Sequence, residues 1–464
     1  MRKRRFIKIL SIFVLTIFMV SSTSFLGCNA LSDENGKNII SIAMATDDNY
    51  VYPTVTAMTS MLENKSEDTY LKFYIMVSGT ISNKNKKRIS LLEDIYDNCS
   101  VDLINMKDKF TSTYLCSSYI TTPTYYRLCL PSLLPQYDKV LYLDGDIIVR
   151  KDLWEIYNTD ISGNYIAAVK DFGKISGGAY YAKRLGVDDM NQYVNAGVLS
   201  LNLKKMREDN MEQKFNEFIP TLKSRKLTLN DQDVLNATCY NKIKFLSPEY
   251  NAMQHFKFSY DNIGILTDCY DSVEWRKACT DPIIVHYSSS SKPWKNSGCR
   301  FYSDWNKYRN IVEDNLYNKT IEEGVYNIVS ALNSRKVIDI YRAGKTNGSN
   351  VQLYDYNGTN AQKFKITYVG QECYEIEAMC SGRVLDVVRA GKTNGTNVFQ
   401  YARNNTDAQK WYIAPVGGGY YNIVSKCNNL CLDVSKGCTK NGTNIQCWAN
   451  NGTKCQQFKF LRTS

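Results

Sequence analysis

Residues 139–149 read KVLYLDGDIIV, an apolar run that is interrupted by Asp144, Gly145 and Asp146. Residues 140–143 have the β-branched and aromatic composition of a short buried strand, so the two carboxylates fall at its carboxyl end. Open α/β sheets bind their ligands beyond the carboxyl ends of their strands. Two carboxylates separated by one glycine form a compact site for a hard divalent cation that also holds phosphate oxygens. The stretch therefore predicts an α/β domain with a metal site at one edge of its sheet.

Two other interpretations of this stretch are open. Asp and Gly are ordinary turn residues, so the same letters fit a strand followed by a polar turn. They also fit a phosphotransferase of the haloacid-dehalogenase type, in which Asp144 would be a covalent nucleophile. That class carries its nucleophile strand at the beginning of the domain, whereas a long segment with an α/β pattern precedes Asp144, so we rank it second.

Four further stretches combine apolar runs with polar side chains: IAMATDDNY at 42–50, YVNAGVLSLNL at 193–203, LNDQDVLN at 229–236 and VHYSSSSKPW at 285–294. Together, and in this order along the chain, the five stretches resemble the family 8 glycosyltransferases. These are retaining nucleotide-sugar transferases with a GT-A fold. The resemblance covers residues 38–310 and implies a Rossmann-like α/β catalytic domain.

The resemblance implies a metal centre. Asp144 and Asp146 match the metal-binding Asp-x-Asp of the family, and His286 matches the histidine that completes the metal shell. Mn²⁺ is the usual ion, and carboxylate plus imidazole ligands suit it. The ion would act as a Lewis acid on the departing UDP. The other histidine, His255, has no motif partner, and we interpret it as structural or acceptor-lining.

The resemblance also implies a UDP-sugar donor and the side chains that hold it. Asp47 and Asn49 match the nucleotide-contacting pair after the first strand, and Tyr50 is placed to lie against the uracil. Lys292 matches a lysine that reaches the diphosphate, where a point cation is physically sensible. Arg127, in TTPTYYRL, matches an arginine near the donor sugar.

The implied catalytic residues are Asp231 and Gln232, which match positions that contact the donor sugar. Gln232 lies where the family has its debated nucleophile or ion-pair stabiliser. Retention of the anomeric configuration requires either a covalent intermediate or departure of the leaving group and attack of the acceptor on the same face of the sugar. An amide is a poor nucleophile, so we favour same-face attack, with Gln232 stabilising positive charge on the sugar. The same residues also fit an Asp-rich helix N-terminus, and both interpretations can hold together.

From about Glu323 the composition shifts toward Asn, Gly, Thr, Tyr and Gln, and a repeat with a period of 47 residues appears. Three copies in one register, with Asn-Gly turns between alternating apolar positions, predict short strands in hairpins. The repeat resembles ricin B-type lectin domains, and this implies an all-β β-trefoil over residues 323–464, behind a linker at 311–322. The recurring positions are Asp339, Asp386 and Asp433; Tyr354, Tyr401 and Trp448; Gln362, Gln409 and Gln456; Phe364, Trp411 and Phe458; and Asn347, Asn394 and Asn441.

Each trefoil copy carries the family's sugar-binding pair, in which a carboxylate accepts bonds from sugar hydroxyls and a ring packs under the sugar. Gln352 and Gln446 match a further polar contact, which Phe399 interrupts in the middle copy. The alternative is a trefoil that is kept only as a spacer. The expected carbohydrate-binding pairs are Asp339 with Tyr354, Asp386 with Tyr401, and Asp433 with Trp448.

The N-terminus has the pattern of an export signal over residues 1–28: a basic start, a short apolar stretch at 9–20 and small residues before Cys28. The ending resembles a bacterial lipobox, so Cys28 is a candidate for lipidation and membrane attachment. We expect a cell-surface lipoprotein or a secreted protein. A lumenal type II membrane protein is the alternative, although the apolar stretch is short for a span.

The distribution of charge bears on the binding partners, and the number of cysteines bears on disulfide formation. The net charge is +11, but Lys and Arg are scattered without a basic stripe, which argues against nucleic acid. An exported chain with 15 cysteines invites disulfides, and Cys431 with Cys447 is the expected local pair.

The predicted function is the Mn²⁺-dependent, retaining transfer of a hexose from a UDP-sugar to a glycan or glycoconjugate, with a lectin module that binds glycans. The alternative is a non-catalytic, exported carbohydrate-binding protein with a degenerate transferase domain.

Overall fold

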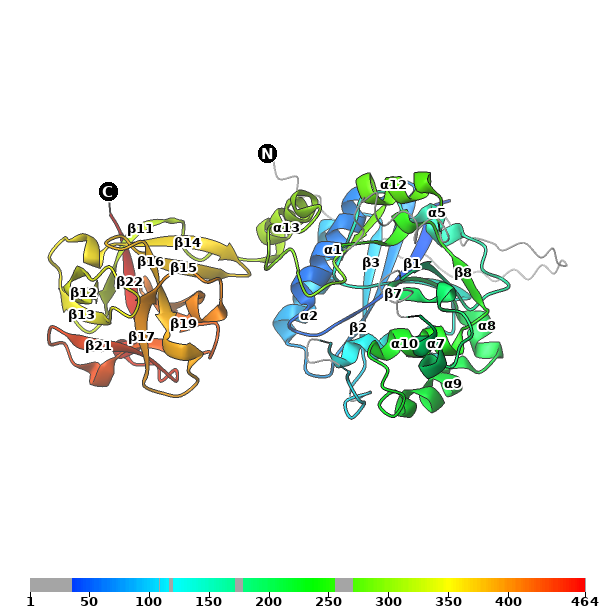
Figure 1. Cartoon of the computed structure of the whole chain (residues 1–464). Helices are drawn as coiled ribbons and strands as arrows, with labels where there is room; N and C mark the ends of the chain where they lie inside the picture. Colours follow the sequence, from blue (N-terminus) through cyan, green and yellow to red (C-terminus); the bar gives the residue numbers. More distant parts are fainter. Residues whose placement is uncertain (1–35, 108, 117–119, 172–177, 255–269, 464) are drawn as a thin grey trace.

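The computed structural model describes residues 36–107, 109–116, 120–171, 178–254 and 270–463. The expected export signal with Cys28, and also His255, lie outside the described residues. None of the helices in the described ranges combines the length and the apolarity needed to cross a membrane. Figure 1 shows an α/β body, followed along the chain by an all-β body.

The α/β body is built on a seven-stranded sheet with the order β3-β2-β1-β4-β7-β6-β8. The strands are β1 (Asn38–Thr46), β2 (Thr69–Val77), β3 (Cys99–Asn105), β4 (Lys139–Leu143), β6 (Ile166–Lys170), β7 (Val194–Asn202) and β8 (Ile243–Phe245). Strands β1 to β4 run parallel, whereas β7 is antiparallel to both β4 and β6. Strand β4 confirms the strand predicted at 140–143.

Helices cover both faces of this sheet (Figure 1). They are α1 (Val51–Asn64), α2 (Asn83–Ser90), α3 (Leu92–Ile95), η1 (Thr122–Cys129), α4 (Leu130–Leu133), α5 (Trp154–Asn158), α7 (Gly178–Leu185), α8 (Leu203–Glu208), α9 (Met211–Phe218), α10 (Asn230–Thr238), α12 (Ser272–Thr280) and α13 (Tyr302–Leu316). In β4, Leu141 and Leu143 pack in one apolar core with α1 and α13, whereas Val140 and Tyr142 pack in a second core with η1 and α10. This alternation is the two-residue period of a strand buried on both faces, and it confirms the predicted α/β fold.

A second, small sheet positions the Asp-Gly-Asp stretch. Its strands are β5 (Ile147–Val149), β10 (Ile284–His286) and β9 (Ala252–Met253), and β10 pairs antiparallel with β5 so that His286 lies opposite Ile147. Because β5 follows β4 after only three residues, the two carboxylates lie where the large and small sheets meet, with His286 next to them.

The all-β body is a twelve-stranded arrangement with its own core. Its strands are β11 (Gly324–Ser330), β12 (Lys336–Ile340), β13 (Val351–Asp355), β14 (Phe364–Gly370), β15 (Cys373–Ala378), β16 (Arg383–Val387), β17 (Thr396–Tyr401), β18 (Trp411–Gly417), β19 (Tyr420–Ser425), β20 (Cys431–Val434), β21 (Thr443–Trp448) and β22 (Phe458–Arg462). The repeated aromatic residues Phe364, Trp411 and Phe458 are fully buried, as expected for core positions. The predicted all-β architecture is confirmed.

Three asparagines join the three repeats in a closed ring. Asn397 donates to the side-chain oxygen of Asn350 at 2.9 Å, Asn350 donates to Asn444 at 2.9 Å, and Asn444 donates to Asn397 at 2.8 Å. Each amide therefore acts once as donor and once as acceptor within the ring. The ring ties equivalent positions of the three lobes together.

Two sequence expectations differ from the structure. The linker expected at 311–322 overlaps α13, whose last turns pack Val312 and Leu316 into the core of the α/β body. Cys431 and Cys447 are free thiols rather than a disulfide. The register between β20 and β21 places Cys447 opposite Leu432, so the two cysteine side chains point to opposite faces of the hairpin.

Candidate active site

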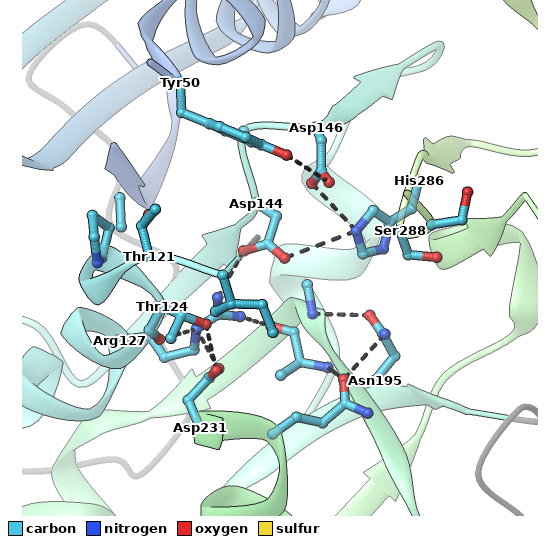
Figure 2. A pocket seen from close by; sticks show the side chains of 18 of the residues that line it. Tyr50, Thr121, Thr124, Arg127, Asp144, Asp146, Asn195, Asp231, His286 and Ser288 are labelled. Atoms are coloured by element: carbon cyan, nitrogen blue, oxygen red, sulfur yellow. Dashed lines mark hydrogen bonds and ion pairs between the residues drawn. The ribbon is translucent and has the colours of Figure 1, made fainter. Parts of the chain in front are cut away.

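A cavity of about 700 Å³ opens where the two sheets of the α/β body meet (Figure 2). It is lined by nearly all the residues to which the sequence assigned donor, metal or catalytic roles. Asn49 is the exception, because it is exposed and does not line the cavity. The residues that the fold brings together here are Asp47, Tyr50, Arg127, Asp144, Asp146, Asp231, Gln232, His286 and Lys292.

Asp144, Asp146 and His286 form a cluster that could hold a metal ion. Their ligand atoms all lie within 4.8 Å of one another. The His286 Nε2 atom is 3.4 Å from Asp146 Oδ1 and 3.8 Å from Asp144 Oδ2 (Figure 2). Two carboxylates and one imidazole are a donor set that suits Mn²⁺ and related divalent ions. The residues present therefore fit the implied ion.

Gly197 leaves room for this cluster. It lies on β7, and its carbonyl oxygen accepts a bond from the backbone N–H of Asp144 at 2.8 Å. A Cβ atom at this position would lie 2.2 Å from His286 Cε1 and 2.8 Å from Asp144 Oδ2. Both distances are far below van der Waals contact, so any side chain here would displace His286 or Asp144.

Asn251 orients the imidazole of His286. Its side-chain oxygen lies 2.8 Å from His286 Nδ1. Its side-chain nitrogen donates to Asn195 Oδ1 at 2.9 Å, and this fixes which end of the amide faces the histidine. Because an amide oxygen can only accept, Nδ1 carries the proton of this bond, and Nε2 is the ring nitrogen that faces the two carboxylates. No motif in the sequence pointed to Asn251.

The same amide chain continues to Gln232. Asn195 Nδ2 donates to Gln232 Oε1 at 3.2 Å, and the backbone N–H of Ala196 donates to the same oxygen at 3.1 Å. Gln232 Nε2 donates to Asp171 Oδ2 at 3.0 Å. The amide of Gln232 is thus held at both ends, and its orientation is linked through Asn195 and Asn251 to the metal cluster. Asp171 is a further site residue that the sequence analysis missed.

We predict that Asn251→Leu weakens Mn²⁺ binding by about 10- to 100-fold, the usual cost of losing a partner that orients a ligand histidine. The side chain is fully buried, and leucine is of similar size, so the fold is expected to persist. Asn251→Asp is the control for the bond to His286, because a carboxylate still accepts from Nδ1, whereas both variants lose the bond that Asn251 donates to Asn195. Titration with Mn²⁺ measures the metal affinity of both variants. Wild-type affinity in Asn251→Leu would show that Asn251 has no orienting role.

Arg127 lies between two carboxylates of the site. Its Nη2 is 2.8 Å from Asp144 Oδ1 and its Nε is 2.9 Å from Asp231 Oδ2, while the guanidinium stacks 4.1 Å above the centre of the Tyr142 ring. Burial alone would lower the pKa of Arg127, but Asp144 and Asp231 outweigh it and raise the pKa above its ordinary value. Arg127 therefore stays charged and fixes both carboxylates.

Asp231 is buried at the start of α10. Burial raises its pKa to about 6, although the charge of Arg127 and the hydroxyl of Thr124 oppose the shift. The predicted helix N-terminus over 231–233 is present, since α10 begins at Asn230. The interpretation as a helix start is thus confirmed, and Asp231 and Gln232 also line the cavity, as their expected role at the donor sugar requires.

Lys292 and Tyr50 meet at Asp146. Lys292 Nζ is 2.5 Å from Asp146 Oδ2 and also donates to the carbonyl oxygen of Tyr287 at 2.6 Å. Burial would raise the pKa of Asp146, but Lys292 and His286 outweigh it and hold the pKa well below its ordinary range. Tyr50 packs edge-on against Trp294, a cavity residue that the sequence analysis did not assign, with ring centres 5.7 Å apart.

Asp47 organises the turn that leads into α1. Its Oδ1 accepts bonds from the backbone N–H groups of Asn49 at 3.0 Å and Tyr50 at 3.2 Å. Asp48, its neighbour, accepts bonds from the backbone and the hydroxyl of Ser82 at 2.9 and 3.0 Å. Carboxylates thus fix residues 47–50 on two sides. We call these residues the donor loop, after the nucleotide contacts that the family resemblance implies for them.

The trefoil aspartates are buried and oriented by glutamines. Asp339 accepts bonds from Gln352 at 2.8 Å and Gln362 at 3.1 Å, and Asp433 accepts bonds from Gln446 and Gln456, both at 3.1 Å. In the middle copy Gln409 donates to Asp386 at 2.8 Å, and Phe399 stands opposite Asp386 where the other copies have glutamine. Burial raises the pKa of all three aspartates.

The expected ring partners are accessible. Tyr354, Tyr401 and Trp448 expose 36%, 39% and 38% of their surfaces. The strand register pairs Tyr354 with Val337 and Trp448 with Cys431, both two residues before the aspartate of the same copy. Each copy therefore presents a carboxylate beside an exposed ring.

Comparison with known proteins supports the family resemblance of both parts of the chain. Residues 41–298 match the glycosyl transferase family 8 model, and residues 315–401, 369–448 and 407–464 match the ricin-type beta-trefoil lectin domain-like model. General stress protein A of Bacillus subtilis is 28% identical over 269 residues, which are 57% of this chain and 91% of that protein.

Two further proteins have descriptions that name a sugar-transfer activity. A lipopolysaccharide 1,2-glucosyltransferase of Escherichia coli is 25% identical over 57% of this chain and 75% of its own. The crystal structure of the galactosyltransferase LgtC, in complex with donor and acceptor sugar analogs, is 26% identical with a TM-score of 0.50, and the match covers 59% of this chain and 96% of that one. With the family model spanning more than half of the chain, this protein belongs to glycosyltransferase family 8 and carries a ricin-type β-trefoil lectin domain behind its catalytic domain.

Proposed function

We propose that this protein transfers a hexose from a UDP-sugar to a glycan or glycoconjugate, with retention of configuration and in dependence on Mn²⁺ or a similar divalent ion. The observation that carries the proposal is the cluster of Asp144, Asp146 and His286 inside a cavity that also holds Lys292 and Arg127. A glucosyltransferase and a galactosyltransferase among its relatives support a hexose as the group transferred.

The side chains that line the cavity would have different roles in binding the donor. A bound divalent ion would supply a Lewis acid beside the diphosphate. Lys292, at the edge of the cluster, would hold a phosphate oxygen as a point charge. Tyr50 and Trp294 offer apolar ring surface for the base, while Arg127 keeps Asp144 and Asp231 in fixed positions. Each of these roles uses a side chain that already lines the cavity.

Gln232 bears on the stereochemical course. Its Oε1 accepts bonds from Asn195 and Ala196, which withdraw electron density from an already weak nucleophile. A covalent sugar–amide intermediate is therefore disfavoured, and departure and attack on the same face of the sugar is the route that we propose. The oriented amide dipole of Gln232 would then stabilise positive charge that develops on the sugar ring.

A donor screen tests the proposal. Purified full-length protein is incubated with individual UDP-sugars and a panel of glycan acceptors, and released UDP is measured with Mn²⁺ and with excess chelator. We expect release from at least one UDP-hexose that rises with acceptor and disappears with chelator. Full-rate transfer in the presence of chelator would contradict the proposed metal dependence.

A second candidate function is a carbohydrate-binding protein without catalysis. The exposed rings beside buried aspartates in all three trefoil copies favour it. It predicts glycan binding without any affinity for UDP and Mn²⁺, which is where it departs from the transferase proposal.

The trefoil is proposed to hold extended glycans near the active site. We predict that the combined change Asp339→Ala, Asp386→Ala and Asp433→Ala leaves transfer to a small acceptor within about twofold of wild type but lowers transfer to a polymeric acceptor by about tenfold or more. The reason is lost effective concentration from several weak sites. Binding to a glycan array measures the sites directly. Array binding that survives the triple change would contradict their assignment.

A further inference from the structure

The turn of the β14–β15 hairpin in the trefoil contacts the catalytic domain at Glu313. Tyr368 Oη donates to Glu313 Oε2 at 2.5 Å, and the backbone N–H of Gln371 donates to both carboxylate oxygens at 2.9 and 3.2 Å. Tyr52 of α1 donates to the same carboxylate from the catalytic side. Glu313 is only 4% exposed, so one buried carboxylate is shared by side chains and backbone of both domains.

Gly370 permits this close approach. Its φ of 88° lies in the left-handed region. A Cβ atom there would lie 2.8 Å from Glu313 Oε1 and 3.4 Å from Tyr52 Oη. The glycine thus serves the turn and the contact between the domains together, and this indicates that the hairpin is shaped to fit the catalytic surface.

Glu372, in the same turn, makes a second contact, with α2. Its carboxylate forms ion pairs with Lys84 and with Arg88, whose Nη2 lies at 2.9 Å. Arg88 is largely buried, and its guanidinium stacks 4.0 Å above the centre of the Tyr317 ring. Burial would raise the pKa of Glu372, but Lys84 and Arg88 outweigh it and hold the pKa below its ordinary value. The ion pair of Arg88 with Glu372 is more enclosed than an ordinary surface ion pair.

Both contacts lead to the donor loop, residues 47–50. Tyr52 stands in the first turn of α1, directly after this loop. Helix α2 begins at Asn83, and Asn85 Nδ2 donates to Asp48 Oδ1 at 2.8 Å, beside the bonds from Ser82 to the same oxygen. The hairpin therefore holds α1, which follows the donor loop. It also holds α2, whose N-terminal residues donate hydrogen bonds to Asp48 of that loop.

We propose that the hairpin turn of the trefoil, residues 368–372, is a positioning element of the donor site. It fixes α1 and α2, and through them the donor loop that would receive the nucleotide; in this respect the inference rests on the proposed function. The trefoil then serves catalysis in two ways, by binding glycan and by preorganising the loop for UDP-sugar. Preorganisation of a binding loop improves affinity because less conformational freedom is lost on binding.

The test compares the double change Tyr368→Phe with Glu372→Gln against Glu377→Gln. The control also loses an ion pair, that of Glu377 with Arg403 at 2.9 Å, but within the trefoil. Calorimetry with UDP and Mn²⁺ gives affinity, and steady-state kinetics separate KM for the donor from kcat. We expect UDP affinity to weaken and KM to rise by about fivefold in the double variant, the lower end of coupling between sites, with kcat within about twofold. The control is expected to behave as wild type.

Melting temperature and glycan binding establish that the trefoil remains folded in both variants. Lys84→Gln provides a second route, because it removes one of the two ion-pair partners of Glu372 from the catalytic side while Arg88 remains, and a smaller change in the same direction is expected. Unchanged UDP affinity and KM in the folded double variant and in Lys84→Gln would overturn this inference alone. Wild-type protein that fails to bind UDP with Mn²⁺ would overturn the proposed function and this inference with it.

Discussion

Asp146→Asn is expected to lower kcat for sugar transfer by about a thousandfold or more, because the loss of one charged ligand weakens the hold on the divalent ion that would neutralise the leaving diphosphate. Asp146 is also the carboxylate that pairs with Lys292 and faces His286, so the change disturbs three groups of the cluster at once. Initial rates of UDP release at saturating donor and Mn²⁺ measure the effect. Asp144→Asn is expected to have an effect of the same order, since Asp144 is the other carboxylate of the cluster.

Asp209→Asn is the matched control for these two variants. Asp209 is an aspartate of similar chemistry that pairs with Lys205 at the surface, away from the cavity. It is expected to keep wild-type rates. Glycan binding by the trefoil should be intact in all three variants. Retention of more than about a tenth of the wild-type rate in Asp146→Asn would show that this carboxylate is not part of the catalytic metal shell.

Gly197→Ala is expected to weaken Mn²⁺ binding and transfer by about a hundredfold or more, although it adds only a single methyl group. The methyl carbon would enter the space of the His286 ring and the Asp144 carboxylate, and neither can move without leaving the cluster. Gly163→Ala is the matched control, because a Cβ atom at Gly163 meets nothing within 4 Å. Mn²⁺ titration and UDP-release rates report on both. Normal metal affinity in Gly197→Ala would mean that the cluster tolerates displacement.

Local sequence patterns were enough to predict the parts of the site that lie at strand ends. The apolar run before Asp144 is β4, and the carboxylates follow it directly. The 47-residue repeat predicted the three lobes of the trefoil, and the repeated core residues Gln362, Gln409, Gln456, Phe364, Trp411 and Phe458 are all buried in the structure. In both cases the signal lies within a few consecutive residues or in strict periodicity, which a single sequence displays openly.

The supporting residues could not be predicted in this way. Asn251 and Asp171 reach the site only because β9 and β6 bring them there, and neither stands in a motif. The contact between Glu313 and the trefoil hairpin joins residues that are far apart in the chain, and it depends on how two domains dock. The expected disulfide failed for a related reason, since strand register decides which cysteines face each other.

Calorimetric titration of UDP into the full-length protein tests the central claim most directly, because it asks whether the cluster of Asp144, Asp146 and His286 is a working metal-nucleotide site. The account predicts binding in the micromolar range with Mn²⁺ present and none with chelator. It also predicts that Asp146→Asn abolishes the binding while the trefoil still binds glycan. Glycan binding by wild-type protein without any Mn²⁺-dependent affinity for UDP would contradict the account and leave a lectin without a transferase activity.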